Sequence, residues 1–223
     1  MGNMTIIEAI KSRHSVRAYN DELINDTTSN LLKGYIDECN AQSGMNFQLI
    51  LNEPNAFDCF LSHYGKFSGV KNYIALVGDK SKSTYESIGY YGEKIVLYAQ
   101  TLGLNTCWVA LTYKKTDAVA IKCGQKIHAV IAIGYGENQG KQRKSKSLAE
   151  VCEGIDHPDW FIRGVEGALL APTAINQQKF YFARNGNVVK IKARLGPYSK
   201  MDLGIVKLHF EICAGIENFV WEV

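Results

Sequence analysis

The spacing of apolar positions along the chain predicts a mixture of helices and strands. Thr5 and Glu8 form a capping-box pair, and isoleucines follow at helical spacing up to Arg13. A long helical pattern later in the chain stops at Gly103, a residue type that commonly follows the last turn of a helix. The predicted helices cover residues 5–13, 26–36, 55–63, 83–102, 156–170 and 202–213, the last capped by Asp202.

Runs of β-branched and aromatic residues between these helices predict strands. They cover residues 47–51, 73–77, 107–111, 129–133, 179–183 and 188–192. Asn185-Gly186, between the last two runs, is a strong hairpin signal. Residues 134–147 are polar and basic, which is typical of a loop. Because strands and helices mix without strict β-α-β alternation, the sequence favours the α+β class.

The two parts of the chain share an order of patterns. Each has a helix, an apolar-Asn-x-Gln stretch, a strand, a helix bounded by two glycines, and a strand with a tryptophan. The glycine pairs are Gly92 with Gly103 and Gly204 with Gly215. Two amphipathic helices can match in this way by coincidence. Alternatively, the chain is an intramolecular pseudo-dimer, and the seam between its halves is a natural place for a ligand cleft.

Composition narrows the class of protein. The 223 residues are 46% hydrophobic and 21% charged, with a net charge of +3, which favours neither nucleic acid nor membrane as a partner. We find no secretory signal pattern and no apolar run long enough to cross a bilayer, so we expect a cytoplasmic protein. The six cysteines are scattered without a CxxC pair, which indicates reduced thiols and no metal site.

Candidate phosphate-binding residues follow the first predicted helix. Arg13 and Arg17 bracket Ser15, and a guanidinium binds phosphate through a planar set of donors that stay charged near neutral pH. The alternative is a helix-end cap with a surface arginine. His14 offers a further ring nitrogen, although a lone exposed histidine usually has no role.

A second basic cluster lies at residues 142–146. Lys144 and Lys146 alternate, so an extended segment would direct both toward one site. A solvated loop is the alternative. Two further segments carry candidate ligand contacts. Asn176, in the turn of residues 171–178, either bonds its own backbone or faces a ligand. Residues 106–111 are either core or a backbone wall that presents N–H groups to a ligand.

Together these segments resemble one known family. RHSVRAY, GEKIVLYAQTLGLNTCWVA, GYGENQGKQRKSKSLAEV and APTAINQQ are similar to motifs of the FMN-dependent nitroreductases. Their order resembles the branch with two fused half-domains in one chain. The resemblance implies a nitroreductase-like fold, with residues 1–153 as a first half that carries the basic motifs. Residues 154–223 would be a shorter second half that supplies APTAINQQ.

The resemblance also implies a role for each site residue. The FMN phosphate would be held by Arg13, Ser15, Arg17, Lys144 and Lys146. His14 would lie near the ribityl chain or the ring edge. The backbone at Ala110 and Leu111 would face flavin N5. The flavin would be contacted from the second half by Pro172, Thr173, Ile175 and Asn176.

The expected activity is therefore hydride transfer from NAD(P)H through FMN to a nitroaromatic, quinone or similar small acceptor. No side chain is assigned as catalytic. The chain departs from the family at Ala110-Leu111, where glycine is common, and at Lys179-Phe180, where Pro-Trp is common. These departures leave an alternative, a non-catalytic flavin-binding or flavin-free relative. A monomer is expected, because the family's dimer interface would be internal.

Overall fold

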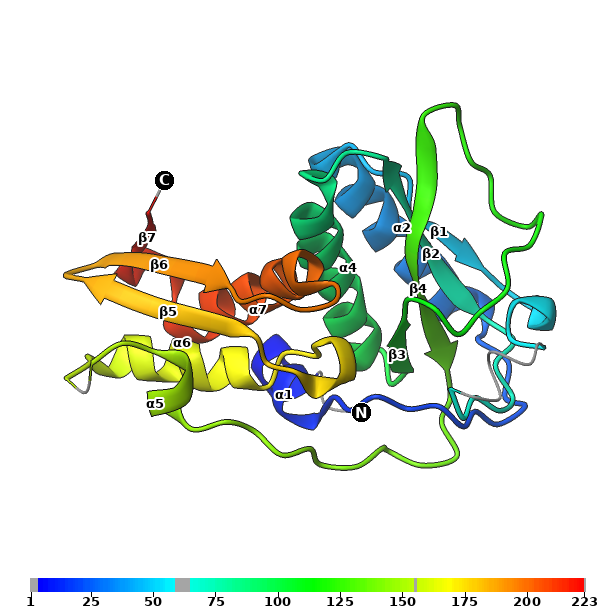
Figure 1. Cartoon of the computed structure of the whole chain (residues 1–223). Coiled ribbons are helices and arrows are strands. Elements are labelled where there is room, and N and C mark those ends of the chain that lie inside the picture. Colours follow the sequence, from blue (N-terminus) through cyan, green and yellow to red (C-terminus); the bar gives the residue numbers. More distant parts are fainter. Residues whose placement is uncertain (1–3, 59–64, 155, 223) are drawn as a thin grey trace.

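The computed structural model describes residues 4–58, 65–154 and 156–222. Two β-sheets lie at opposite ends of the molecule, and helices fill the space between them (Figure 1). The two long helices α4 (Thr84–Thr101) and α7 (Ser199–Ala214) pack against each other at the centre. This pairing joins the first part of the chain to the second.

The larger sheet is antiparallel and has the strand order β1-β2-β4-β3. Its strands are β1 (Gln48–Ile50), β2 (Tyr73–Asp79), β3 (Asn105–Val109) and β4 (Gln125–Gly134). The two central strands are apolar on both faces, as expected for strands covered on both sides. Ile74 and Leu76 pack with residues of α2 and α4, whereas Ala75 and Val77 pack on the other face.

Local sequence signals explain the first helices. Thr5 caps α1 (Ile6–Ser12) through the predicted capping box with Glu8. Helix α2 (Asp26–Ser43) begins after Asn25, whose side chain accepts a hydrogen bond from Thr28 N at 2.9 Å. It ends at Gly44, which has a positive φ of 70°.

The smaller sheet has the order β5-β6-β7 and covers helices of the second part of the chain. Phe161, Phe182 and Phe210 meet at the centre of this core, with Phe182 and Phe210 stacked at 4.8 Å. Its elements are α5 (Leu148–Val151), α6 (Asp159–Leu169), η2 (Ala174–Asn176), β5 (Phe180–Asn185), β6 (Val188–Ala193), η3 (Ile216–Asn218) and β7 (Val220–Trp221).

A close helix crossing joins α4 to α7. A Cβ atom added to Gly89 would collide with the carbonyl oxygen of Met201, and one added to Gly204 would collide with that of Glu86. Glycine therefore allows the two backbones to approach at a distance that no other residue permits. The crossing fixes the position of α7 relative to the larger sheet, and so the shape of the cavity between the two parts.

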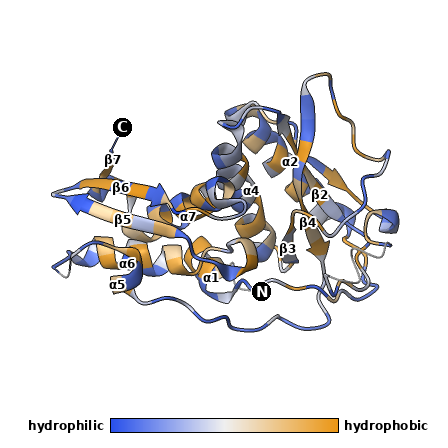
Figure 2. Cartoon of the chain, in the orientation of Figure 1, coloured by the Kyte–Doolittle hydropathy of each residue, from blue (hydrophilic) through white to orange (hydrophobic). Residues whose placement is uncertain are grey.

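A long hydrophilic connection, residues 135–147, runs from β4 to α5 along one side of the molecule (Figures 1 and 2). The apolar residues in Figure 2 gather instead on the central strands and on the helix faces between the sheets. The predicted loop in this region is confirmed. It links the two cores, because Val151 and Cys152 at its far end already pack with the second one.

The structure confirms most predicted elements and corrects three details. The strand predicted at 107–111 ends at Val109, so Ala110 and Leu111 lie in a turn. The hairpin loop is Gly186-Asn187 rather than Asn185-Gly186, because Asn185 still pairs with Val188. Gly186 takes a φ of 61° at the first loop position, as in a type II′ turn.

The third correction concerns the last helix. Asp202 does not cap it, because Tyr198 occupies that position and Asp202 lies inside the first turn. The helix predicted at 55–63 falls partly outside the described residues, and Pro54–Ala56 forms a 3₁₀ turn, η1. The proposed duplication and the division at residue 153 stay predictions.

Candidate active site

A cavity of about 1010 Å³ lies between the two parts of the chain. This volume is at the upper end of the range of about 300–1000 Å³ that is usual for ligand sites. Its walls come from residues 14–18, 65–67, 108–112, 138–143 and 172–176 and from the first turns of α7. Segments more than a hundred residues apart in sequence therefore share one site.

The first wall is the segment after α1, which runs beside β3. Val16 N donates to Thr106 O at 3.1 Å, and Ser15 pairs with Thr106 as in a parallel bridge. This pairing fixes the backbone, so that His14, Ser15 and Arg17 line the cavity. Arg17 is exposed at one edge.

Residues 110–112 form the second wall, directly after β3. Leu111 is 70% exposed and lines the cavity together with Ala110. Trp108, one strand position before Val109, also lines it. The indole of Trp108 packs against Gly92 of α4, and its Nε1 donates to Glu93 of the same helix, so α4 fixes the position of this side chain.

The third wall is the turn at residues 172–176. Ile175 and Asn176 have φ values of 47° and 55°, in the left-handed region. Asn176 Nδ2 donates to the carbonyl oxygen of Lys144 at 2.8 Å. The amide of Asn176 thus ties this turn to the basic loop, and Ile175 is left 89% exposed at the cavity.

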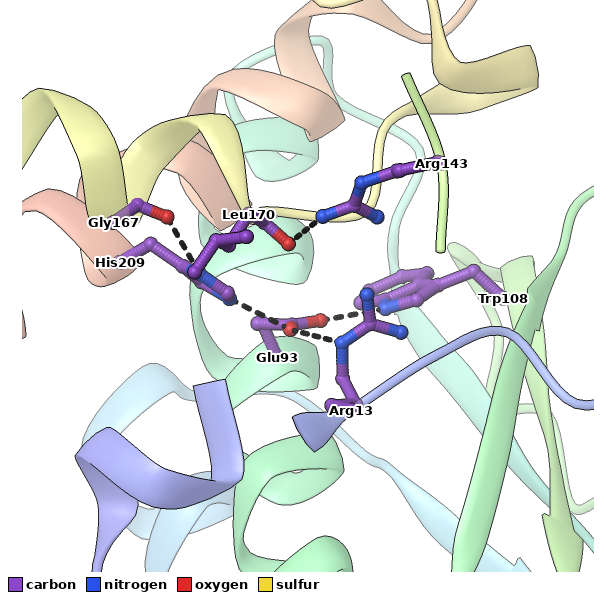
Figure 3. A network of polar contacts seen from close by, with 7 residues as sticks. All are labelled: Arg13, Glu93, Trp108, Arg143, Gly167, Leu170 and His209. Atoms are coloured by element: carbon purple, nitrogen blue, oxygen red, sulfur yellow. Dashed lines mark hydrogen bonds and ion pairs between the residues drawn. The ribbon is translucent and has the colours of Figure 1, made fainter. Parts of the chain in front are cut away.

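A buried polar network lies behind these walls (Figure 3). Glu93 on α4 is fully buried, and its carboxylate accepts hydrogen bonds from Trp108 Nε1 at 2.8 Å and contacts His209 Nε2 at 2.9 Å. Arg13 forms an ion pair with the same carboxylate, with 3.7 Å between Arg13 Nε and Glu93 Oε1. His209 Nδ1 faces Gly167 O, so α4, α6, α7, β3 and the segment after α1 meet at one carboxylate.

Arg143 adds a second cation beside this network. Arg143 lines the cavity, and its guanidinium donates to the carbonyl oxygen of Leu170. Arg13 and Arg143 extend toward one another in Figure 3. Burial, followed by repulsion from Arg13, lowers the pKa of Arg143 to about 10, so it stays charged at neutral pH. Arg13 Nη2 and Arg143 Nε are buried and have no acceptor among the described residues.

The titratable groups around the cavity differ in their charge at neutral pH. Burial and the nearby arginines lower the pKa of His14, which favours a neutral imidazole. Burial raises the pKa of the Cys107 thiol, so it is no nucleophile. Burial also raises the pKa of Asp202, to about 6, although hydrogen bonds from Gln177 and Ala174 oppose this shift. The cavity is therefore cationic on one side and carries one buried carboxyl on another.

Of the predicted site residues, all but three line the cavity. Arg13 lies behind the wall, with its side chain 1% exposed. Lys144 is exposed, and Lys146 Nζ donates to the carbonyl oxygen of Gln178 at 3.0 Å. This connection contributes Asn138, Gly140, Lys141 and Arg143 to the lining of the cavity instead.

Sequence reasoning also missed two other contributions to the cavity. Trp108, within the segment 106–111 that was expected to be either core or a backbone wall, both packs against Gly92 and lines the cavity. Asp202 was expected as a helix cap, and it lines the cavity. The signal for Asp202 was weak, because its partners Ala174 and Gln177 lie 28 and 25 residues earlier in the chain.

Comparison with known proteins identifies the fold family. Residues 5–214 match the family model described as "Putative TM nitroreductase". The chain belongs to this nitroreductase family. The match spans both parts of the chain and includes every segment that lines the cavity. A search of curated proteins finds no significant match.

Solved structures support the same fold. A structure described as a putative nitroreductase from Thermotoga maritima superposes with a TM-score of 0.71 at 22% identity, covering 96% of this chain and 85% of that one. A structure from Desulfovibrio desulfuricans, described as a putative nitroreductase in complex with FMN, gives 0.53 at 20% identity, covering 69% and 98%. At these identities the likeness establishes the nitroreductase fold alone. No helix in the described part of the chain is long and apolar enough to span a membrane.

Proposed function

We propose that this protein is an FMN-dependent oxidoreductase that uses NAD(P)H to reduce a nitroaromatic, quinone or similar small acceptor. The observation that carries this proposal is the cavity itself. Its walls combine the RHSVR and APTAIN segments, which the family resemblance assigns to the two ends of the flavin. When bound, FMN would supply two-electron transfer between the nicotinamide and the acceptor.

The residues present fit a phosphorylated ring cofactor. Arg17 and Arg143 line the cavity, and the buried Nε–H group of Arg143 has no acceptor among the described residues. A phosphate monoester is close to a dianion and would satisfy such donors. The aromatic and apolar side chains of Trp108, Leu111 and Ile175 suit a flat ring.

The chain's own residues would bind and orient the cofactor rather than exchange protons with it. Arginine stays protonated throughout the physiological range, and His14 is neutral, so the cationic wall holds an anion and does not act as an acid. The turns at 110–112 and 172–176 would exclude water from the ring. We also propose one FMN per chain, because the RHSVR and RKSK segments occur only in the first part of the sequence, and a monomeric enzyme, because the family's dimer interface would be internal.

The flavin-free alternative rests on side chains that would close the site. Leu111 is mostly exposed and lines a cavity of about 1010 Å³, so it does not fill that space. Among the described residues, no contact of Ala110 or Leu111 favours the flavin-free alternative.

Spectroscopy of the protein mixed with FMN tests both candidates. The proposal predicts a flavin spectrum that stays with the protein on gel filtration and bleaches when NADH or NADPH is added without oxygen. Protein that loses all FMN on gel filtration, and gains no thermal stability from it, would contradict the proposal, since a ligand specific for the native state must stabilise it.

A further inference from the structure

The turn over the cavity is held in an unfavourable backbone conformation. Ile175, Asn176 and Gln178 have φ values of 47°, 55° and 46°. Asparagine tolerates this region, whereas for a β-branched isoleucine it is a genuine outlier. Such a conformation is unfavourable for a residue with a side chain, so contacts from outside the turn must hold it.

One carboxylate provides contacts from the α7 side. Asp202 is 7% exposed, and its Oδ1 accepts a hydrogen bond from Ala174 N at 3.0 Å. Its Oδ2 accepts from Gln177 Nε2 at 2.6 Å. Gln177 Nε2 also donates to Pro197 O at 2.7 Å. Because Asp202 Oδ2 and Pro197 O are both acceptors, the nitrogen of this amide and not its oxygen must face them.

The basic loop holds the opposite side of the turn. The carbonyl oxygen of Lys144 accepts from Asn176 Nδ2 at 2.8 Å and from Gln178 Nε2 at 3.0 Å. Gln178 Oε1 accepts from Lys146 N at 2.9 Å. Lys146 Nζ adds a charged donor from this loop to Gln178 O at 3.0 Å. Asp202, on α7, contributes the carboxylate that holds the other side.

We propose that Asp202 is a positioning residue, whose carboxylate clamps Ala174 and Gln177 and so holds the strained turn against the ligand cavity. Hydrogen bonds to a charged acceptor are roughly twice as strong as neutral ones, which suits a segment under strain. The clamp itself follows from these contacts; its consequence for flavin binding rests on the proposed function.

The clamp depends on the protonation of Asp202. The carboxylate accepts from both donors, but a protonated acid turns one oxygen into a donor that faces another donor. Because burial raises the pKa of Asp202 to about 6, this change falls near neutral pH. No ion pair joins Asp202 to another described residue. The titratable and charged groups that line the same cavity are His14, Arg17, Lys66, Lys141, Arg143 and Tyr198.

Hydrogen exchange of the ligand-free protein tests the clamp. In Asp202→Asn, amides of residues 173–178 should exchange about tenfold faster than in the wild type, while the core strands keep their protection. Gln177→Leu removes the donor, leaves the carboxyl group, and should loosen the same segment. Asp159→Asn is the matched control, because Asp159 is an exposed acid in the first turn of α6.

The dependence on pH separates a clamp from general stabilisation. The hydrogen bonds from Gln177 and Ala174 lower the pKa of Asp202, so a local opening that breaks them while the carboxyl stays buried on α7 is favoured by protonation. After correction for intrinsic exchange rates, protection of residues 173–178 in the wild type should therefore fall as the pH drops through about 6, with no such step in Asp202→Asn. Global unfolding hydrates the carboxyl and has the opposite dependence on pH. Unchanged exchange in both Asp202→Asn and Gln177→Leu would overturn the proposal. So would a wild type with no pH step in this segment, or loosening spread evenly over the whole chain.

Flavin binding is measured separately on the same variants. FMN affinity should fall more steeply on acidification in the wild type than in Asp202→Asn, because the second pKa of the phosphate, at about 6, acts equally in both. If FMN fails to bind the wild type at any pH, the proposed function fails, and the exchange experiment still decides whether Asp202 holds the turn.

Discussion

Replacing Glu93 by glutamine removes the only negative charge in the described part of the buried network. Arg13 is always protonated, its side chain is 1% exposed, and its one ion-pair partner among the described residues is Glu93. The substitution keeps the shape of the side chain and an acceptor for Trp108. What changes is that a buried guanidinium loses its counter-charge.

The cost follows from this burial. Removing one partner of a buried ion pair typically destabilises a protein by about 3–5 kcal/mol, because the other charge stays buried and uncompensated. Since the hydrogen bond from Trp108 Nε1 can persist, we expect Glu93→Gln to fall at the lower end, at about 3 kcal/mol. With a urea m-value of about 3 kcal/mol/M, the unfolding midpoint should drop by about 1 M.

Urea unfolding followed by tryptophan fluorescence measures this cost against a control on the same helix. Glu86 pairs with Lys207 at the surface, with side chains 41% and 26% exposed, so Glu86→Gln should cost at most about 1 kcal/mol. Equal midpoints for Glu93→Gln and Glu86→Gln would refute the reasoning, since the buried carboxylate would then not hold α4, α7 and Arg13 together.

Three further predictions follow from the site and the helix crossing. Arg143→Ala should weaken FMN binding by about 1.5–3 kcal/mol in fluorescence titrations, and Lys144→Ala, at an exposed side chain outside the cavity, by at most about 1 kcal/mol. Burial raises the pKa of Asp202 from 3.8 to about 6, so the folded protein binds this proton more tightly than the unfolded chain does. The resulting gain in the free energy of unfolding is fully present below pH 3.8 and is lost as the pH rises through about 6. Urea unfolding on either side of pH 6 should show this loss in the wild type and not in Asp202→Asn; the same slope in both would count against it. Gly204→Ala should lower the free energy of unfolding by about 1–3 kcal/mol, because the added Cβ collides with α4. Gly34→Ala, where nothing lies near the new Cβ, should raise it by about 0.5–1 kcal/mol. An unchanged free energy of unfolding in Gly204→Ala would contradict the described crossing.

Local chemistry made most of the fold predictable. The capping box at Thr5, the glycine stop at Gly103 and the apolar strand at 73–77 act within a few residues, so their outcome depends little on the rest of the chain. The end of β3 was less predictable. Val109 is the last residue paired with β4, and hydrophobicity continues past it into Ala110 and Leu111 because these residues line a cavity.

The candidate site was predictable only where a motif carried its own geometry. The basic cluster was evident, but Lys146 bonds Gln178 through its main-chain N and its Nζ, and no local pattern reveals these contacts. Asp202 resembled an ordinary helix cap, because no local pattern reveals its partners either. Its partners come from a turn that the fold brings alongside α7.

We expect the one cavity, shared by both parts of the chain, to bind one flavin. Titration of the purified protein with FMN, followed by quenching of flavin fluorescence, counts the flavins directly. The fluorescence should saturate at one FMN per chain, with weaker binding in Arg143→Ala. Saturation at two FMN per chain, or no quenching at any concentration, would mean that the cavity is not a single flavin site.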